Sequence, residues 1–190
     1  MSYLTLLYEA LDQYVEYVVL DTETTGLREG EICSIAIINN KGETLLDTLV
    51  RTKLPIPPGA TKIHDITDEM VKDAQTWFNV REQVLDIIDA KLVFIYNTAY
   101  DRRMMHQSDT LNAVEHFDYK FQANFVCVME AFAEFYGDWN DWSKSYTWKK
   151  LSVAARHFQY ASTEYHSALG DCHATLAVVN GLALARLTKQ

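Results

Sequence analysis

The sequence predicts an α/β fold with a mixed central sheet, on the basis of three observations. Three strand-like segments come first: "YVVL" at 17–20, "ICSIAII" at 32–38 and "ETLLDTLVR" at 43–51. The turn signal "NNKG" separates the last two, which indicates an antiparallel meander. The later segment "KLVFIYN" at 91–97 is a short continuous apolar run, typical of a central parallel strand. Helical segments flank these strands, so helices should cover the sheet.

Residues 1–16 predict an amphipathic helix that precedes the first strand. Its apolar residues recur every three or four positions, at Leu4, Leu7, Leu11 and Val15. We expect this helical extension to pack against the fold, with a surface for a second copy of the chain or another partner as the alternative. Other helices are expected over 68–90 in two pieces and over 100–109, 123–137, 147–160 and 170–187.

Two segments are predicted to be loops. "KLPIPPGATKIHDIT" holds all three prolines of the chain and favours an irregular surface loop with an exposed His64. Residues 138–146, "DWNDWSKSY", are polar and aromatic. We expect Trp139, Trp142 and Trp148 to pack against the fold. Stacking on bases is the alternative, since binders of single strands use aromatic platforms.

Length and composition limit the classes of function. The chain has 190 residues, and we expect 1–190 to form a single domain. A net charge of −9 argues against a protein that coats nucleic acid nonspecifically, but it is compatible with an enzyme that holds one strand end. Three cysteines without CxxC spacing indicate a reducing, cytoplasmic setting. No stretch approaches the apolar length of a membrane span, so no membrane association is expected.

Four acidic residues are expected to meet at one edge of the sheet. Asp21 and Glu23 follow the first strand two positions apart, so their side chains share one face. Two like charges so close destabilise each other unless a proton or a cation intervenes. Asp101 lies just beyond the strand at 91–97, where sites form in open α/β sheets. Asp171 lies near the start of the last helix, where the helix dipole favours a carboxylate.

Three motifs contain these acids: "DTETTGL" from Asp21, "YNTAYD" up to Asp101 and "HSALGD" from His166 to Asp171. Together and in this order they resemble the motifs of the DEDDh family of 3′→5′ exonucleases. The resemblance covers nearly the whole chain, from about residue 17 to residue 185, and "ATKIHDITDEMV" is similar to a loop in many members. It implies a ribonuclease H-like fold.

By this resemblance, Asp21, Glu23, Asp101 and Asp171 match four metal-ligating acids, and His166 matches the general base. Phosphodiester hydrolysis needs a hydroxide nucleophile and neutralisation of the leaving oxygen, which two Mg²⁺ or Mn²⁺ ions about 4 Å apart supply. Such hard cations take oxygen ligands, which suits carboxylates. An imidazole titrates close to neutral pH and suits removal of a proton from the attacking water.

The resemblance also implies contacts with the 3′-terminal nucleotide. Thr24, Thr25, Gly26 and Leu27 lie along that nucleotide in the family, and Leu27 would wedge against the last base. Turn chemistry alone also explains Gly26. Asn97 either binds the same nucleotide or satisfies local backbone groups.

Two residues depart from the family pattern. Tyr96 stands where relatives often have histidine, and Tyr100 stands where phenylalanine is usual. All five catalytic positions are kept, so the activity is expected while the substrate preference stays open.

The leading hypothesis is a metal-dependent 3′→5′ exonuclease that releases nucleoside 5′-monophosphates from single-stranded or frayed 3′ ends, of DNA rather than RNA. The alternative from another class is a noncatalytic nucleic-acid-binding or polymerase-associated module on the same fold. An exoribonuclease or oligonucleotidase is a third reading. A homodimer and a polymerase partner both stay open.

Overall fold

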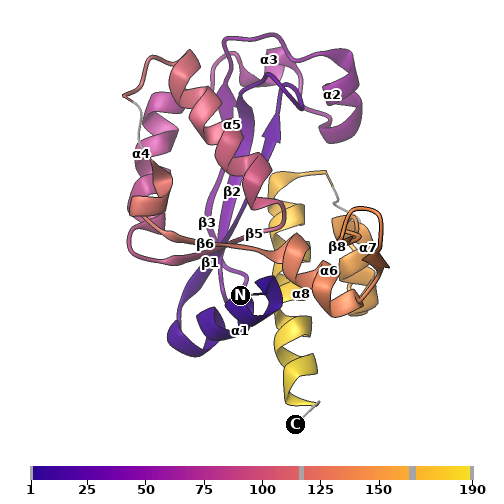
Figure 1. Cartoon of the computed structure of the whole chain (residues 1–190). Helices are drawn as coiled ribbons and strands as arrows, with labels where there is room; N and C mark the ends of the chain where they lie inside the picture. Colours follow the sequence, from indigo (N-terminus) through magenta and orange to yellow (C-terminus); the bar gives the residue numbers. More distant parts are fainter. Residues whose placement is uncertain (1, 116–117, 163–165, 189–190) are drawn as a thin grey trace.

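A six-stranded mixed sheet forms the centre of the computed structural model, which describes residues 2–115, 118–162 and 166–188 (Figure 1). Its strands are β1 (Tyr17–Thr24), β2 (Ile32–Asn39), β3 (Thr44–Arg51), β4 (Gln75–Thr76), β5 (Leu92–Ile95) and β6 (Asn124–Cys127). They follow the order β4-β3-β2-β1-β5-β6 across the sheet. β1, β2 and β3 form the predicted antiparallel meander, β5 pairs parallel to β1, and β6 pairs parallel to β5.

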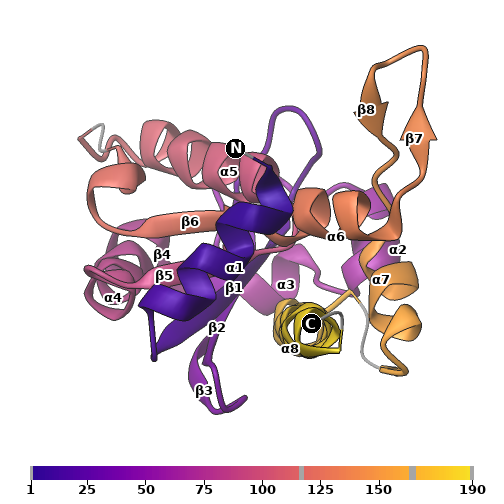
Figure 2. The same cartoon turned by 60° about the horizontal axis from the view of Figure 1, so that its bottom comes forward.

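Helices cover both faces of this sheet (Figures 1 and 2). Alternate residues of β1 point to opposite faces: Tyr17 and Val19 belong to one apolar cluster, and Val18 and Leu20 to the other. The first face carries α1 (Tyr3–Gln13), α6 (Val128–Tyr136), α7 (Leu151–His157) and α8 (Ala168–Leu187). The second carries α4 (Trp77–Ile88), α5 (Thr98–Leu111) and the 3-10 turn Tyr119–Phe121.

The structure corrects three predictions of local structure. The proline-rich segment contains the helix α2 (Pro58–His64), because Pro58 takes the first helical position, where a missing N–H costs nothing. The short helix α3 (Asp68–Val71) follows. The start of the helix predicted over 123–137 forms the edge strand β6, since a short apolar run fits either element. The predicted loop at 138–146 contains a hairpin of β7 (Trp139–Asn140) and β8 (Ser145–Tyr146).

The helix α8 packs along the sheet and supplies much of its apolar cover. By length and composition alone its 20 residues would suffice to cross a membrane, although no such stretch was expected. Half of that apolar window is buried inside the protein. Its buried Cys172, Val178 and Leu182 contribute to the same cluster as Val19 of β1, and this packing accounts for the apolar composition.

The helix α1 is held against α6 and α8. Its Leu7 is fully buried. The backbone N–H groups of Tyr3 and Leu4 each donate a 2.9 Å hydrogen bond to the carboxylate of Glu134 on α6. Arg186 of α8 donates two hydrogen bonds, of 3.0 and 2.9 Å, to the carboxylate of Asp12. The helix ends at Gln13, so Val15 lies outside it and is exposed.

Gly181 of α8 lies directly against the ring of Phe158, which itself packs on Phe132 and Phe135. A Cβ at Gly181 would come within 2.2 Å of that ring. We expect Gly181→Ala to lower the free energy of unfolding by about 1–3 kcal/mol, the usual cost of overpacking, as measured by urea denaturation.

Gly59→Ala is the matched control for this substitution. A Cβ at Gly59 meets nothing within 4 Å, and alanine is the better helix former, so stability should stay equal or rise. Equal losses in the two variants would show that the contact with Phe158 does not limit this position.

Candidate active site

Three of the predicted acids come together at the carboxyl end of β1. Asp21 and Glu23 share one face of the strand, as the two-residue period predicts, and Asp171 enters from the first turn of α8. One carboxylate oxygen of each residue lies within 4.8 Å of the others. Oxygen ligands at this spacing suit a hard divalent cation, so the three residues form a candidate metal centre.

Asp101 reaches the same region from the other face of the sheet. It lies in the first turn of α5, is 3 % exposed, and accepts a 2.7 Å hydrogen bond at Oδ1 from Thr22 Oγ1. Thr22 alternates with Asp21 and Glu23 along β1, so its hydroxyl points to the α5 face. The fold thus brings all four predicted acids to one edge of the sheet, three of them within mutual reach.

Burial raises the pKa of all four carboxyl groups, and repulsion from neighbouring acids adds to the rise at Asp21, Glu23 and Asp101. Burial is the largest cause at each. The charges of Asp101, Asp171 and Glu23 further raise the pKa of Asp21, and the pKa of Glu23 rises to about 8. The hydrogen bond from Thr22 partly offsets the rise at Asp101. Such a cluster is relieved by bound protons or by a bound cation.

His166 lies in the turn before α8, with its side chain exposed. Its backbone N–H donates to Asp171 Oδ1 at 3.4 Å, and this contact lowers the pKa of Asp171 against the effect of burial. Its φ of 70° is left-handed, which costs a non-glycine residue on the order of 1–3 kcal/mol. Ser167 then caps α8 by accepting from the N–H of Gly170 at 3.1 Å. The turn fixes the histidine backbone against the acids and leaves its ring in solvent.

A cavity of about 300 Å³ opens beside Glu23. The four residues after it that were predicted to contact substrate all line this cavity: Thr24, Thr25, Gly26 and Leu27. The opposite wall comes from α2 and its flanks and from the start of α5. Its residues are Pro57, Gly59, Ala60, Ile63, His64 and Tyr100.

The loop after β1 is held by its own polar groups. Thr25 donates from its N–H to Glu31 O at 2.9 Å, and its Oγ1 accepts from the N–H of Glu31 at 3.1 Å. Thr24 Oγ1 lies 2.5 Å from the hydroxyl of Tyr100. Gly26 is required here because a Cβ would stand 2.7 Å from Glu29 O. The threonine hydroxyls are therefore engaged within the protein, while the side chain of Leu27 is exposed.

His64 is buried, contrary to the expected exposed loop histidine. Its Nδ1 accepts from the N–H of Ile66 at 3.1 Å, so the ring proton is on Nε2, which donates to Thr24 O at 3.3 Å. Burial lowers the pKa of His64. The ring thus links α2 to the end of β1. The sequence did not predict which residues of α2 line the cavity. The only signal for this segment was the similarity of "ATKIHDITDEMV" to a loop found in many family members.

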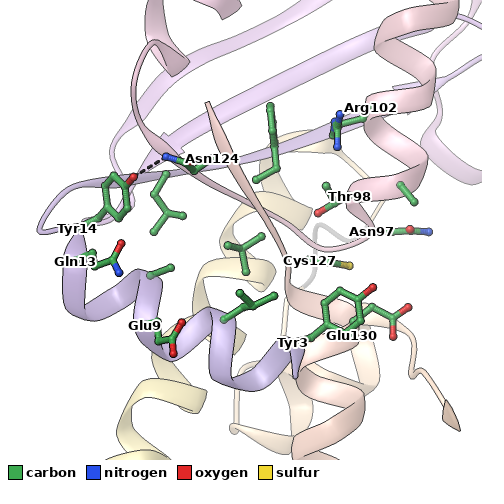
Figure 3. Close-up of a pocket in the computed structure, with 16 residues that line it drawn as sticks. Tyr3, Glu9, Gln13, Tyr14, Asn97, Thr98, Arg102, Asn124, Cys127 and Glu130 are labelled. Atoms are coloured by element: carbon green, nitrogen blue, oxygen red, sulfur yellow. Dashed lines mark hydrogen bonds between the residues drawn. The ribbon is translucent and has the colours of Figure 1, made fainter. Parts of the chain in front are cut away.

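Asn97 lies apart from this cavity. It lines a second one, of about 500 Å³, between α1, β6 and the start of α5 (Figure 3). Tyr14, which directly follows α1, accepts a 2.5 Å hydrogen bond there from the side chain of Asn124 on β6, and Arg102 lies on the α5 side. Of the five predicted substrate contacts, the structure therefore gathers four beside the acids.

Comparisons with known proteins agree with this arrangement. The family model RNase_T, described as an exonuclease, matches residues 18–179. The chain is 40 % identical over 171 residues to "Uncharacterized exonuclease CP81" of Escherichia phage 186, which covers 87 % of both proteins. It is 27 % identical over 164 residues to Exodeoxyribonuclease 10 of Escherichia coli strain K12, covering 85 % of this chain and 66 % of that protein.

Solved structures show the same fold. "Exonuclease X in complex with 5′ overhanging duplex DNA" superposes with a TM-score of 0.64 at 23 % identity, over 90 % of this chain and 93 % of that one. The mixed sheet and its clustered acids define a nuclease of ribonuclease H-like fold. The chain belongs to the exonuclease family that the RNase_T model describes. The predicted fold class and the predicted kinship to exonucleases are both confirmed.

The raised pKa of Glu23 predicts how stability depends on pH without metal. Glu23 titrates at about 8 in the folded protein against an ordinary value of 4.5, so between these values the folded state binds more protons than the unfolded state. Stability must then fall as pH rises through this range. In EDTA, we expect the Tm of the wild-type protein to fall more steeply between about pH 5 and pH 8 than the Tm of Glu23→Gln. Addition of Mn²⁺ near pH 8 should restore the wild-type Tm.

Glu29→Gln, at an exposed acid of the following loop, should keep the wild-type profile. A Tm that is flat or rises with pH in EDTA would be incompatible with a repulsive carboxylate cluster.

Proposed function

We propose that this protein is a metal-dependent 3′→5′ exonuclease that acts on DNA and releases nucleoside 5′-monophosphates, with 1–190 working as a single domain. One observation carries this: Glu23 belongs both to the carboxylate cluster and to the wall of the 300 Å³ cavity. A reactive centre at the edge of a small pocket suits the terminal nucleotide of a strand. The motif order supports the 3′ polarity, and the relative named as an exodeoxyribonuclease supports DNA.

In this proposal Asp21, Glu23 and Asp171 hold the divalent cations, and Asp101 supports the site from the other face. The residues fit such ions, because all donors are carboxylate oxygens whose pKa values are raised by burial and, at Asp21 and Glu23, also by repulsion from neighbouring acids. Bound Mg²⁺ or Mn²⁺ would supply a hydroxide nucleophile and neutralise the leaving oxygen. Thr22 keeps Asp101 oriented through its hydrogen bond.

His166 takes the proton of the attacking water and returns it to solvent through its exposed ring. Its backbone contact with Asp171 keeps it at the cluster. The exposed Leu27 packs against the terminal base, and Gly26 lets the backbone approach the sugar.

DNA and RNA strands of one sequence, labelled at the 5′ end, test this activity in Mg²⁺, Mn²⁺ or EDTA. We expect a ladder that shortens from the 3′ end of DNA, is absent in EDTA, and is lost in Asp21→Asn. Asp73→Asn, at an exposed acid outside the cluster, should behave as wild type. Folded wild-type protein that hydrolyses neither strand in either metal, or that shortens strands from the 5′ end, would refute the assignment.

His166→Ala should lower kcat by about 10²–10⁴-fold, the usual contribution of a general base, while metal-induced thermal stabilisation stays unchanged. His173→Ala is the matched control, since the ring of His173 lies against the turn at Gly42. Similar kcat values for the two variants would remove His166 from the mechanism.

A further inference from the structure

A hairpin projects from the body between α6 and α7, formed by β7 and β8 (Figure 2). Trp142 near its tip is 94 % exposed, and Trp148 at its base is 59 % exposed. Trp139 and Tyr146 are about half and one-third exposed. The predicted packing of the tryptophans is therefore wrong, because the strands pair with each other and carry the rings away from the core. Four large aromatic residues exposed on one short arm form a candidate contact surface.

The hairpin is internally braced. Trp139 and Tyr146 form a cross-strand T-shaped pair with centroids 5.1 Å apart. In the turn, Asn140 Oδ1 accepts from the N–H groups of Trp142 at 2.9 Å and Ser143 at 3.1 Å. The backbone is thus ordered before any partner binds, which lowers the entropic cost of contact.

The root of the hairpin is tied to the edge of the sheet that carries the acids. The hydroxyl of the buried Tyr96 donates a 2.6 Å hydrogen bond to the carbonyl of Lys149. Tyr96 directly follows β5, and its own carbonyl accepts from the N–H of Met129 at the start of α6. Tyr96 is therefore the residue through which the end of β5 anchors the hairpin.

The charge of the hairpin differs from that of the chain. Residues 138–150 hold three lysines against two aspartates, within a protein of net charge −9. Lys149 pairs with Asp138, and Lys144 lies 3.6 Å from Asp141. These two ion pairs leave the hairpin with a net charge of +1, three lysines less two aspartates. Exposed rings on a weakly positive arm match nucleic-acid strands, which offer bases for stacking and carry negative phosphates.

We infer that the hairpin is a second contact for nucleic acid, in which Trp142 stacks on an unpaired base of the strand whose 3′ end occupies the cavity. This rests on the proposed function. A protein partner fits less well, because the arm is narrow (Figure 2) and its root is fixed to the end of β5. Tyr96 is a positioning residue for this contact.

Anisotropy of a labelled single strand of about 20 nucleotides, in EDTA, measures this contact without hydrolysis. Trp142→Ala should weaken binding by about 5- to 150-fold, the range for loss of one stacked base. Phe78→Ala is the matched control, since Phe78 is an exposed aromatic on α4, on the opposite side of the molecule (Figures 1 and 2), and its removal should change nothing.

Kinetics separate this contact from a structural role. With metal, Trp142→Ala should raise KM for the long strand and leave hydrolysis of a dinucleotide unchanged, and Tyr96→Phe should give the same split in weaker form. Unchanged binding of the strand in Trp142→Ala would overturn the inference. This holds even if the hairpin is then found to bind a protein.

Binding and hydrolysis fail independently. Binding that depends on Trp142 in a protein that never hydrolyses would support the hairpin contact and refute the proposed exonuclease. Hydrolysis by a protein whose strand binding does not depend on Trp142 would support the exonuclease and refute the hairpin contact.

Discussion

The confinement of like-charged carboxylates at the end of β1 is the constraint on which the rest of the structure depends. The pleat fixes Asp21 and Glu23 on one face, while Asp171 and Asp101 are brought in by helices on opposite faces. Each additional carboxylate increases the electrostatic repulsion within the cluster, which carboxylates free to move would relieve by moving apart. The apolar clusters on both faces of β1 prevent that movement. The free energy of core packing therefore offsets the electrostatic repulsion at the site.

The same strand also sets the position of the cavity. Its last residues turn into a loop whose backbone is fixed by Glu31, and the ring of His64 joins the end of β1 to α2. Glu31 is buried, and its carboxylate accepts from the backbone N–H groups of Lys53 and Leu54, each at 2.5 Å. The wall of the cavity is thereby connected to the chain after β3. The carboxylate cluster and the cavity therefore share one segment, which these hydrogen bonds hold in place.

Much of this could be predicted from the sequence, because local periodicity and motif order determine it. The two-residue spacing of Asp21 and Glu23 gave their shared face, and the apolar run before Asp101 gave the edge that it reaches. The burial of His64 could not be predicted, since it depends on how α2 packs against the end of β1, and the prolines of this segment indicated a loop instead of a helix. The exposure of Trp142 could not be predicted either, because apolar size favours burial and only the pairing of β7 with β8 opposes it.

The late position of α8 in the chain has a consequence for biosynthesis. Asp171 follows the other three acids by seventy residues or more, and α8 also supplies the apolar cover for β1. A nascent chain on the ribosome therefore exposes one face of its central strand, and lacks the last of the four carboxylates, until α8 emerges. A fragment released before that point therefore cannot complete the carboxylate cluster.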